Sequence, residues 1–421
     1  MGKKIVLDFA FTLSGGVVPY FKGMMKNISK VDKRNRYCVL LTDQGLDLIE
    51  DVEFSSNIEL FIFPKLISNS YRLVWEQLEL PKFLYKNKID VLFCVNNRVP
   101  FRRTKTKKIF LLGTLGPFEK KYLLNFSLKE RVQYKFLEYL IVQSLKKADH
   151  TIFESHYTKN LVRRKYGYRG RCSVNHHGKQ DIKLNSYSST NIAEVKNKYG
   201  LSKNYLLYVT YIRRYKNFER LIRVFSEARQ SFNQDIEFVV AGPLAPVEPT
   251  TYLDTLRNLC AEYNLDKSFK FIGMVEHNDL TPLSLGCFAY VFPSEFENLS
   301  YALVEALELG LPIITTTGTA MPETCEDAAI YFDPDDDQKL TECLINMVNN
   351  EELRNSLKKK SINRSKYFRG IKQEIIYNAD IFDKINYRSK TKKDNLRSKL
   401  FKFFGKKYLK HINDNKESLI Q

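Results

Sequence analysis

Residues 294–310 read SEFENLSYALVEALELG, directly after the apolar run CFAYVFPS at residues 287–294. The short run, closed by Pro293, is typical of a buried parallel strand. From Leu299 onward the apolar residues recur at helical spacing, which predicts an amphipathic helix from near Ser300 to Gly310. A strand that leads straight into a helix favours an open α/β sheet.

Two carboxylates stand in this stretch, Glu297 and Glu305, with seven residues between them. Glu297 falls in the loop at the carboxyl end of the strand, where open α/β sheets bind ligands. Glu305 flanks the apolar stripe of the helix. A structural explanation is also open for each, because a carboxylate before a helix favours the helix dipole by at most about 1 kcal/mol.

The same alternation of short apolar runs and longer amphipathic stretches continues through all 421 residues. It predicts parallel sheets with helices on both faces, and the length suffices for two such domains. A polar, Ser-rich segment around residues 183–197 is the predicted linker. The predicted strands are IVLDFAF, YCVLLT, IDVLFCV, KIFLLG, HTIFES, YLLYVT, IEFVVAG, FKFIG, FAYVFPS and LPIITT.

Net charge is the outstanding feature of the composition. The chain has 67 Lys and Arg against 48 Asp and Glu, a formal charge of +19, which indicates an anionic partner. Part of the charge lies in FRRTKTKK near residue 105, and part in the last residues, 387–421. Between Leu396 and Ile412 apolar and basic residues interleave at near-helical intervals, as in a helix on an anionic membrane. An ordinary basic terminus is the alternative.

The cysteines and the apolar runs bear on location. Seven cysteines are scattered singly, which favours a reducing compartment and speaks against a zinc site or a disulfide framework. The N-terminal run is too short for a signal peptide, and no stretch approaches the roughly 20 apolar residues of a membrane-spanning helix. We therefore expect a cytoplasmic protein.

Two loops have residues suited to binding anions. In LSGGVVPYFKGM, residues 13–24, Gly15 and Gly16 would let backbone amides approach an anion or a sugar, although a lone Gly-Gly pair also marks a plain turn. After the strand that begins near Tyr205, three cations crowd one loop and suit a diphosphate, while a solvated basic loop is the alternative. These cations are Arg213, Arg214 and Lys216.

In this order, the pieces resemble the retaining GT-B-fold glycosyltransferases called glycosyl transferases group 1, or glycosyltransferase family 4. Residues 293–334, PSEFENLSYALVEALELGLPIITTTGTAMPETCEDAAIYFDP, are similar to that family's donor-site block, whose paired glutamates are its most diagnostic feature. The resemblance covers roughly residues 4–385. Further matches are the Gly15–Gly16 loop, WEQLELP (75–81), ADHTIFESHYTKNLV (148–162), HHG (176–178), YKN (215–217) and VVAGP (239–243).

The resemblance implies a fold and the boundaries of its domains. It implies two Rossmann-like, doubly wound domains that face each other across a cleft, followed by a basic tail. The N-terminal, acceptor-side domain would span residues 1–185 and the donor domain residues 186–370. A helix at 371–386 would pack back on the N-terminal domain, and residues 387–421 would form the basic amphipathic tail.

The resemblance also implies roles for the site residues. Glu297 would contact the donor sugar, and Lys216, helped by Arg213 or Arg214, would neutralise the leaving diphosphate, so Glu297 and Lys216 are the predicted catalytic residues. Glu305 would accept hydrogen bonds from the ribose hydroxyls. The remaining predicted donor-binding residues offer backbone amides: Gly15, Gly16, Asn298, Leu299 and Ser300.

Some positions depart from the family's pattern. Thr210 and Tyr211 stand where Gly-Arg is frequent, Asn298–Ser300 replaces a frequent Gly-Phe-Gly, and no His follows Gly113-Thr114 in the N-terminal domain. The missing His leaves the N-terminal contribution to catalysis open. The aspartates of FDPDDDQ, residues 332–338, resemble the turn that caps a late helix in the family.

The resemblance thus implies a metal-independent, retaining hexosyltransferase of bacterial surface polysaccharide or glycolipid synthesis. Its co-substrate would be a nucleotide diphosphate sugar, with no cofactor, and its acceptor a saccharide or a lipid-linked chain. The tail would hold it peripherally on the inner face of the membrane. Alternatives are a catalytically silent GT-B partner subunit, a GT-B-fold epimerase or a phosphorylase. No RNA-binding motif or zinc spacing supports a nucleic-acid partner. The nucleotide, the sugar, the linkage and the oligomeric state stay open.

Overall fold

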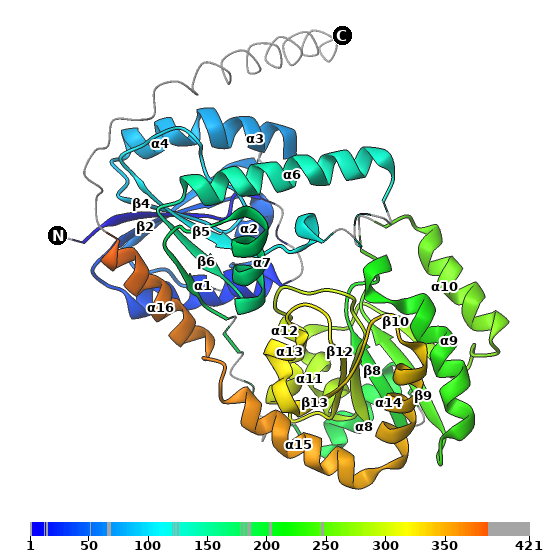
Figure 1. Ribbon diagram of the computed structural model, residues 1–421. Helices are drawn as coiled ribbons and strands as arrows, with labels where there is room; N and C mark the ends of the chain where they lie inside the picture. Colours follow the sequence, from blue (N-terminus) through cyan, green and yellow to red (C-terminus); the bar gives the residue numbers. More distant parts are fainter. Residues whose placement is uncertain are drawn as a thin grey trace, which may run out of the picture. The chain divides into compact units, whose positions relative to one another are not determined.

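The strands form two parallel sheets, which confirms the predicted α/β class with two Rossmann-like domains (Figure 1). The computed structural model describes residues 2–385, except residues 12, 14–15, 51, 65–68, 120, 122, 124–125, 177, 180–181, 183–186, 202–203 and 246–247. The predicted tail, residues 387–421, and the predicted boundary between residues 185 and 186 lie outside the described residues. The predicted domain limits therefore stay predictions.

The N-terminal sheet has the strand order β3-β2-β1-β4-β5-β6-β7. Its strands are β1 (Lys4–Asp8), β2 (Arg36–Leu41), β3 (Ile58–Ile62), β4 (Val91–Cys94), β5 (Lys107–Leu112), β6 (His150–Phe153) and β7 (Cys172–Val174). Every pairing recorded between them is parallel. The carboxyl ends of these strands therefore meet at one edge of the sheet.

The second sheet repeats the plan with the order β10-β9-β8-β11-β12-β13. Its strands are β8 (Asn204–Val209), β9 (Ile236–Ala241), β10 (Phe269–Gly273), β11 (Ala289–Phe292), β12 (Ile313–Thr316) and β13 (Ala329–Phe332). All ten predicted strands are present. The predicted helix near Ser300 is α12 (Tyr301–Glu308), and Gly310 beyond it has a φ of +68°.

The helices cover both faces of each sheet. Alternate residues of β1 belong to different cores: Ile5 and Leu7 pack with α1 and α16, whereas Val6 packs with α3, α4 and α6. The N-terminal helices are α1 (Val17–Val31), α2 (Asp43–Asp47), α3 (Asn69–Leu78), α4 (Leu80–Lys86), α6 (Leu128–Lys147) and α7 (His156–Tyr166). The later ones are α8 (Ser189–Lys198), α9 (Phe218–Ala228), α10 (Thr251–Glu262), α11 (His277–Leu285), α12, α13 (Met321–Cys325), α14 (Asp337–Asn349), α15 (Glu351–Ser365) and α16 (Ile371–Lys384).

The predicted linker at 183–197 is wrong over most of its length, because residues 189–198 form α8. A capping box starts this helix: the Ser188 side chain accepts from the backbone N–H of Asn191, and the Asn191 side chain accepts from the backbone N–H of Ser188. Ser and Asn are common in loops, but they also cap the starts of helices, so the composition of this stretch wrongly indicated a linker. Residues 183–186 lie outside the described part.

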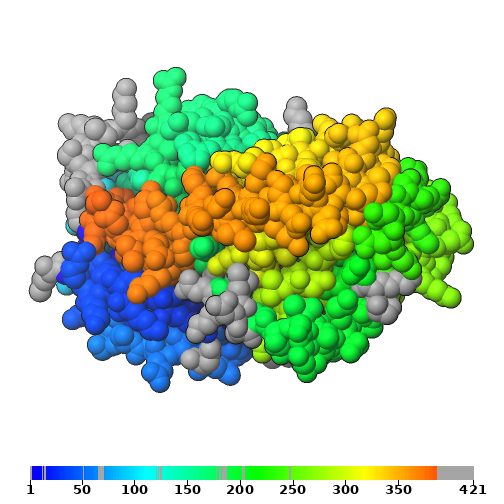
Figure 2. Space-filling model, turned by 90° about the horizontal axis from the view of Figure 1, so that it is seen from below, coloured from blue at the N-terminus to red at the C-terminus, as the bar shows by residue number. Residues whose placement is uncertain are grey.

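The last helices return to the start of the chain. Figure 2 shows α15 and α16 as one continuous ridge that ends against the blue N-terminal residues. Ile371, Ile375 and Phe382 of α16 join the core formed by β1 and α1. The two segments that connect the sheets touch: Lys179 N–H donates to Arg369 O at 2.8 Å, and Ile371 N–H donates to Lys179 O at 3.1 Å.

Gly178 is required for this docking, and its replacement by alanine is expected to destabilise the protein by about 1–3 kcal/mol. An added Cβ would lie 2.5 Å from Ile371 Cα and 2.8 Å from Ile371 N, so backbone would have to move. The same shift would strain the 2.7 Å hydrogen bond from Gly178 N–H to Glu374. Urea unfolding measures the loss. Gly45→Ala is the control, since its Cβ would meet side chains and no other backbone, Leu41 at 3.3 Å and Leu13 at 3.7 Å.

Candidate active site

The loop between β11 and α12 lies at the carboxyl end of the second sheet. Its Phe296 is buried in the core of the N-terminal half and stacks on Tyr215, with ring centroids 4.6 Å apart. Glu297 N–H donates to Thr319 Oγ1, and that hydroxyl donates back to Glu297 O, both at 2.8 Å. These contacts fix the backbone of the loop and set the direction of the Glu297 side chain.

Lys216 and Glu297 form a buried ion pair. Lys216 is 7% exposed, and its ammonium lies 5.0 Å from the ring centre of Tyr215 and 5.2 Å from that of Phe292. Burial by itself lowers the pKa of Lys216, but the charge of Glu297 outweighs it and holds that pKa above its ordinary value. The two predicted catalytic residues, far apart in sequence, are therefore adjacent in the structure.

The other two cations of the loop differ in their surroundings. Arg214 is exposed, and its Nε lies 3.4 Å from a carboxylate oxygen of Glu248, with the guanidinium 5.1 Å from the ring centre of Tyr252. Arg213 is half-buried and lowers the pKa of Tyr215 through a hydrogen bond, although burial dominates and that pKa stays raised. The Arg214 side chain is thus directed toward Glu248, whereas the Arg213 side chain lies beside Tyr215, the neighbour of Lys216.

The predicted anion site depends on the backbone amides at the start of α12. Leu299 and Ser300 are buried, and Ser300 is the N-cap residue, without a hydrogen bond from its side chain to the helix. Among the residues that the structure describes, no acceptor is assigned to the amides of Asn298, Leu299 and Ser300. These N–H groups, with the positive end of the helix, can stabilise an anion.

Glu305 lies on the buried side of α12. Burial, and next the charge of Glu308, raises the pKa of its carboxyl to about 7. Within the described part of the chain, no hydrogen bond or ion pair to this carboxyl is recorded. A half-buried carboxyl without such a partner is a functional candidate rather than a solvated surface charge.

The glycine loop is described only in part, because Gly15 lies outside the described residues. Gly16 has an ordinary helical φ of −60° and precedes α1. A Cβ there would meet the ring of Tyr301 at 3.1 Å. The structure thus gives Gly16 a further reason to be glycine, because α12 of the second half approaches it closely.

The side chain of Asn298 joins the two halves, a role that the sequence did not predict. Its Nδ2 donates to Glu154 Oε2 at 2.6 Å and to Leu112 O at 3.2 Å. Its Oδ1 accepts from Thr158 and, at 3.1 Å, from Ser155 Oγ. The partners come from the carboxyl ends of β5 and β6 and from α7, so the matched motif ESHYT is an interdomain contact.

A second contact between the halves centres on Glu323 of α13. Its Oε1 accepts from His156 N–H at 2.6 Å and lies 2.8 Å from His176 Nε2, and its Oε2 accepts from Tyr157 N–H at 2.8 Å. Burial raises the pKa of Glu323, but these bonds outweigh it and hold the pKa below its ordinary value. Ligand atoms of His156, His176 and Glu323 lie within 4.8 Å of one another, which these hydrogen bonds account for.

A cluster of buried charges lies at the carboxyl ends of β1 and β4. Glu76, from the matched motif WEQLELP, pairs with Arg98 Nε at 2.8 Å and with Arg72 Nε at 3.1 Å. Asn96 Nδ2 donates to Glu76 at 2.9 Å and to Asp8 at 3.2 Å. Burial, and next the charge of Glu76, raises the pKa of Asp8 to about 7. The sequence motif could not predict this ion pair, because Arg98 lies 22 residues from Glu76 and outside the motif.

The aspartates after β13 bind cations of the protein. Asp336 caps α14 by accepting from Lys339 N–H at 2.8 Å, as predicted. Asp335 pairs with Lys121 of the N-terminal half at 2.6 Å. Asp337 pairs with Arg220 and Arg223.

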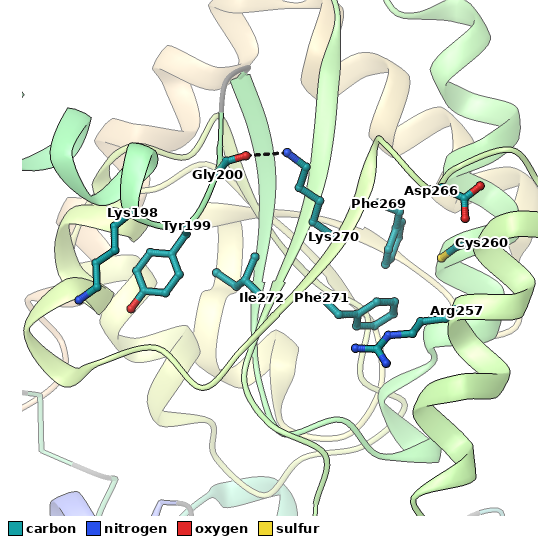
Figure 3. Close-up of a pocket in the computed structure, with 10 residues that line it drawn as sticks. All are labelled: Lys198, Tyr199, Gly200, Arg257, Cys260, Asp266, Phe269, Lys270, Phe271 and Ile272. Atoms are coloured by element: carbon teal, nitrogen blue, oxygen red, sulfur yellow. Dashed lines mark hydrogen bonds between the residues drawn. The ribbon is translucent and has the colours of Figure 1, made fainter.

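Two surface hollows lie away from the predicted donor residues. One, of about 600 Å³, runs along the edge strand β10, where Lys270 donates to Gly200 O at 2.8 Å (Figure 3). The other, of about 130 Å³, is lined by His176 and residues 367–369. No predicted site residue lines either hollow, so the candidate active site rests on the charged groups around Glu297 and not on a cavity. No described helix is both long and apolar enough to cross a membrane.

Comparisons with known proteins agree with this geometry. Residues 191–364 match the family model described as glycosyl transferases group 1. The serotype-specific mannosyltransferase WbdA of Escherichia coli is 26% identical over 45% of this chain and 23% of its own length. The O-antigen chain mannosyltransferase B of Escherichia coli is 21% identical over 57% of this chain and 61% of its own length. Each match thus spans less than two thirds of the relative.

Solved structures share the fold over nearly the whole chain. WaaG, a glycosyltransferase involved in lipopolysaccharide biosynthesis, has a TM-score of 0.69 and 15% identity, covering 90% of this chain and 100% of that one. HepE of Anabaena, in complex with UDP and glucose, has a TM-score of 0.68 and 15% identity, covering 91% and 100%. These likenesses show the GT-B fold.

Proposed function

Because residues 191–364 match the family model of glycosyl transferases group 1, we propose that this chain moves a sugar from a nucleotide diphosphate sugar to an acceptor hydroxyl, with retention at the anomeric carbon. The observation that carries the proposal is the buried Lys216–Glu297 pair at the carboxyl end of the second sheet. A fixed cation beside a fixed carboxylate suits a reaction in which a negatively charged group leaves a sugar.

The proposed roles follow from the surroundings of each group. Lys216 and Arg213 would stabilise the departing diphosphate, together with the amides at the start of α12. Glu297 would exchange part of its contact with Lys216 for the donor sugar. Glu305 would accept hydrogen bonds from the ribose, and Arg214 would serve only if it left Glu248.

The names of the relatives bear on the substrates. Both curated relatives quoted above are mannosyltransferases, one named for the O-antigen chain and one for a serotype. We propose a hexose donor, with mannose tested first, and a saccharide or lipid-linked acceptor of surface polysaccharide synthesis. The chain would work in the cytoplasm, held on the inner membrane face by the basic residues of 387–421.

A thermal-shift screen against UDP, GDP, ADP and their hexose conjugates tests the donor. Ligand at a hundred times its dissociation constant should stabilise the fold by about 2.7 kcal/mol. Stabilisation by one nucleotide, lost in Lys216→Ala and Glu305→Ala, supports the assigned roles. No shift with any nucleotide would instead favour the catalytically silent partner subunit. NMR of the product's anomeric proton distinguishes retention from inversion and transfer from epimerisation.

Donor affinity is expected to rise between pH 6 and pH 8, because the pKa of Glu305 is raised to about 7 and the ribose hydroxyls need the ionised carboxylate. Affinity is lost as the pH falls through that pKa, where the carboxyl becomes protonated. Titration calorimetry with the nucleotide sugar measures it, since the diphosphate diester does not titrate in this range. The donor affinity of Glu305→Gln should not change with pH over the same range. If its affinity rose with pH as in the wild type, another group would be responsible for the titration.

We also propose that transfer needs no metal cofactor, since Lys216 and Arg213 can supply the positive charge at the diphosphate. The aspartates after β13 are paired with Lys121, Arg220 and Arg223. Activity should therefore be unchanged, within about twofold, after dialysis against EDTA. Recovery of lost activity by Mg²⁺ or Mn²⁺ would contradict this.

A further inference from the structure

Helix α6 (Leu128–Lys147) has two apolar faces. One face, with Leu140, Ile141 and Leu145, packs on the N-terminal sheet. On the other side, Leu128 is 79% exposed, Val132 63%, Phe136 52% and Tyr139 53%. At roughly 100° per residue these four outer side chains fall within a sector of about 80°. We call them the α6 outer stripe.

The charges on α6 are divided in the same way. Five cations of the helix are exposed: Lys129, Arg131, Lys135, Lys146 and Lys147. Both carboxylates of α6 are engaged in hydrogen bonds or ion pairs: Glu130 in the capping box with Ser127, and the buried Glu138 with Tyr166, with Lys165 and, at 2.7 Å, with Lys135. The outer side of α6 therefore combines an apolar stripe with an excess of positive charge.

We propose that the α6 outer stripe docks on an anionic lipid surface, with its apolar side chains in the interface and the flanking cations on the headgroups. An apolar sector bordered by Lys and Arg is the pattern of helices that lie in a membrane interface. In Figure 1, α6 is an outermost helix of the N-terminal half, in the layer of α3 and α4. Those helices also expose Tyr71, Leu78 and Tyr85.

Charge argues against two other occupants. A second copy seated stripe to stripe would bring the same cations together, and like charges facing each other are unfavourable. Residues 387–421 have eleven Lys and Arg against three Asp and Glu, so they would be repelled as well. The proposal is independent of the tail and of the transfer reaction, since binding is measured without donor or acceptor.

Co-sedimentation of the full chain with phosphatidylcholine vesicles, with and without phosphatidylglycerol, tests the proposal. Wild type should bind the anionic vesicles, and Val132→Glu with Phe136→Glu should weaken partitioning at least about tenfold. The control is Met274→Glu with Ile376→Glu, two exposed apolar residues elsewhere with the same change in charge. Undiminished binding of the α6 variant would overturn the proposal, as would equal loss in the control.

Insertion is measured separately with Phe136→Trp, because the one natural tryptophan, Trp75, is buried. Quenching of the added tryptophan by brominated anionic lipid is expected, and vesicle binding without quenching would overturn the proposal. Sedimentation velocity without lipid examines self-association: a dimer that the α6 variant abolishes would make the outer stripe an interface between copies instead.

Discussion

Replacement of Lys216 by methionine is expected to lower kcat for sugar transfer about 10²- to 10³-fold, the usual effect of removing one fixed group that stabilises a leaving charge. The ammonium is buried beside two aromatic rings and paired with Glu297, so methionine would remove the charge from a position fixed by its surroundings. Initial rates with saturating nucleotide sugar measure the effect.

The same change should reduce the free energy of unfolding by about 3–5 kcal/mol, because it leaves the carboxylate of Glu297 without its cation in a mostly buried position. Adding Glu297→Gln to Lys216→Met removes that stranded charge. The double variant should regain much of the stability but none of the activity, which separates the catalytic role from a structural one. Lys198→Met is the control, since Lys198 forms exposed ion pairs with Glu276 and Asp279. Wild-type turnover in Lys216→Met would end the proposed role.

Asn298→Ala is expected to destabilise the protein by about 3 kcal/mol and to lower the unfolding cooperativity of its two halves. The amide makes hydrogen bonds to Glu154, Leu112, Ser155 and Thr158, all in the N-terminal half. A buried polar group that loses its partner costs about 1–3 kcal/mol, and more when it is charged.

Unfolding followed at far-ultraviolet wavelengths and by calorimetry measures this effect. Asn349→Ala is the control, because the Asn349 side chain also makes hydrogen bonds, but its two bonds are exposed and stay within one half. An equal loss in the control would show that the position of Asn298 between the halves is unimportant. Since its side chain touches none of the proposed donor-binding charges, nucleotide affinity should change less than stability.

The strands show why the sequence predicted most of the fold. The ten that it predicted include every interior strand, since a parallel strand covered on both faces reads as a continuous apolar run. The three it missed, β3, β7 and β13, all lie at sheet edges, and most of their residues are only partly buried. Partly exposed strands can contain polar residues, as IELFI and CSV do, so they lack the continuous apolar run by which a strand is recognised.

The sequence also predicted some of the site residues and missed others. Lys216 and Glu297 were predicted through the resemblance, and the structure brings them together. The side-chain role of Asn298 was missed, because its partners lie at the carboxyl ends of β5 and β6 and at the start of α7, 140 or more residues earlier. The different surroundings of Arg213 and Arg214 also needed the structure, since Arg213 is half-buried beside Tyr215 whereas Arg214 is exposed and pairs with Glu248. Spacing along the chain predicts neighbours on one helix and carries no information on such pairings.

The backbone bonds between Lys179 and the segment 369–371 have a mechanical consequence. The chain passes between its two sheets twice, and the backbone bonds of Lys179 tie the two crossings to each other. Two separate crossings would let the halves twist and slide, whereas two that share a point act as a single hinge. We expect this tie to limit opening of the site to rotation about one axis, so that each closure would return the loop of Glu297 to the same register with α7.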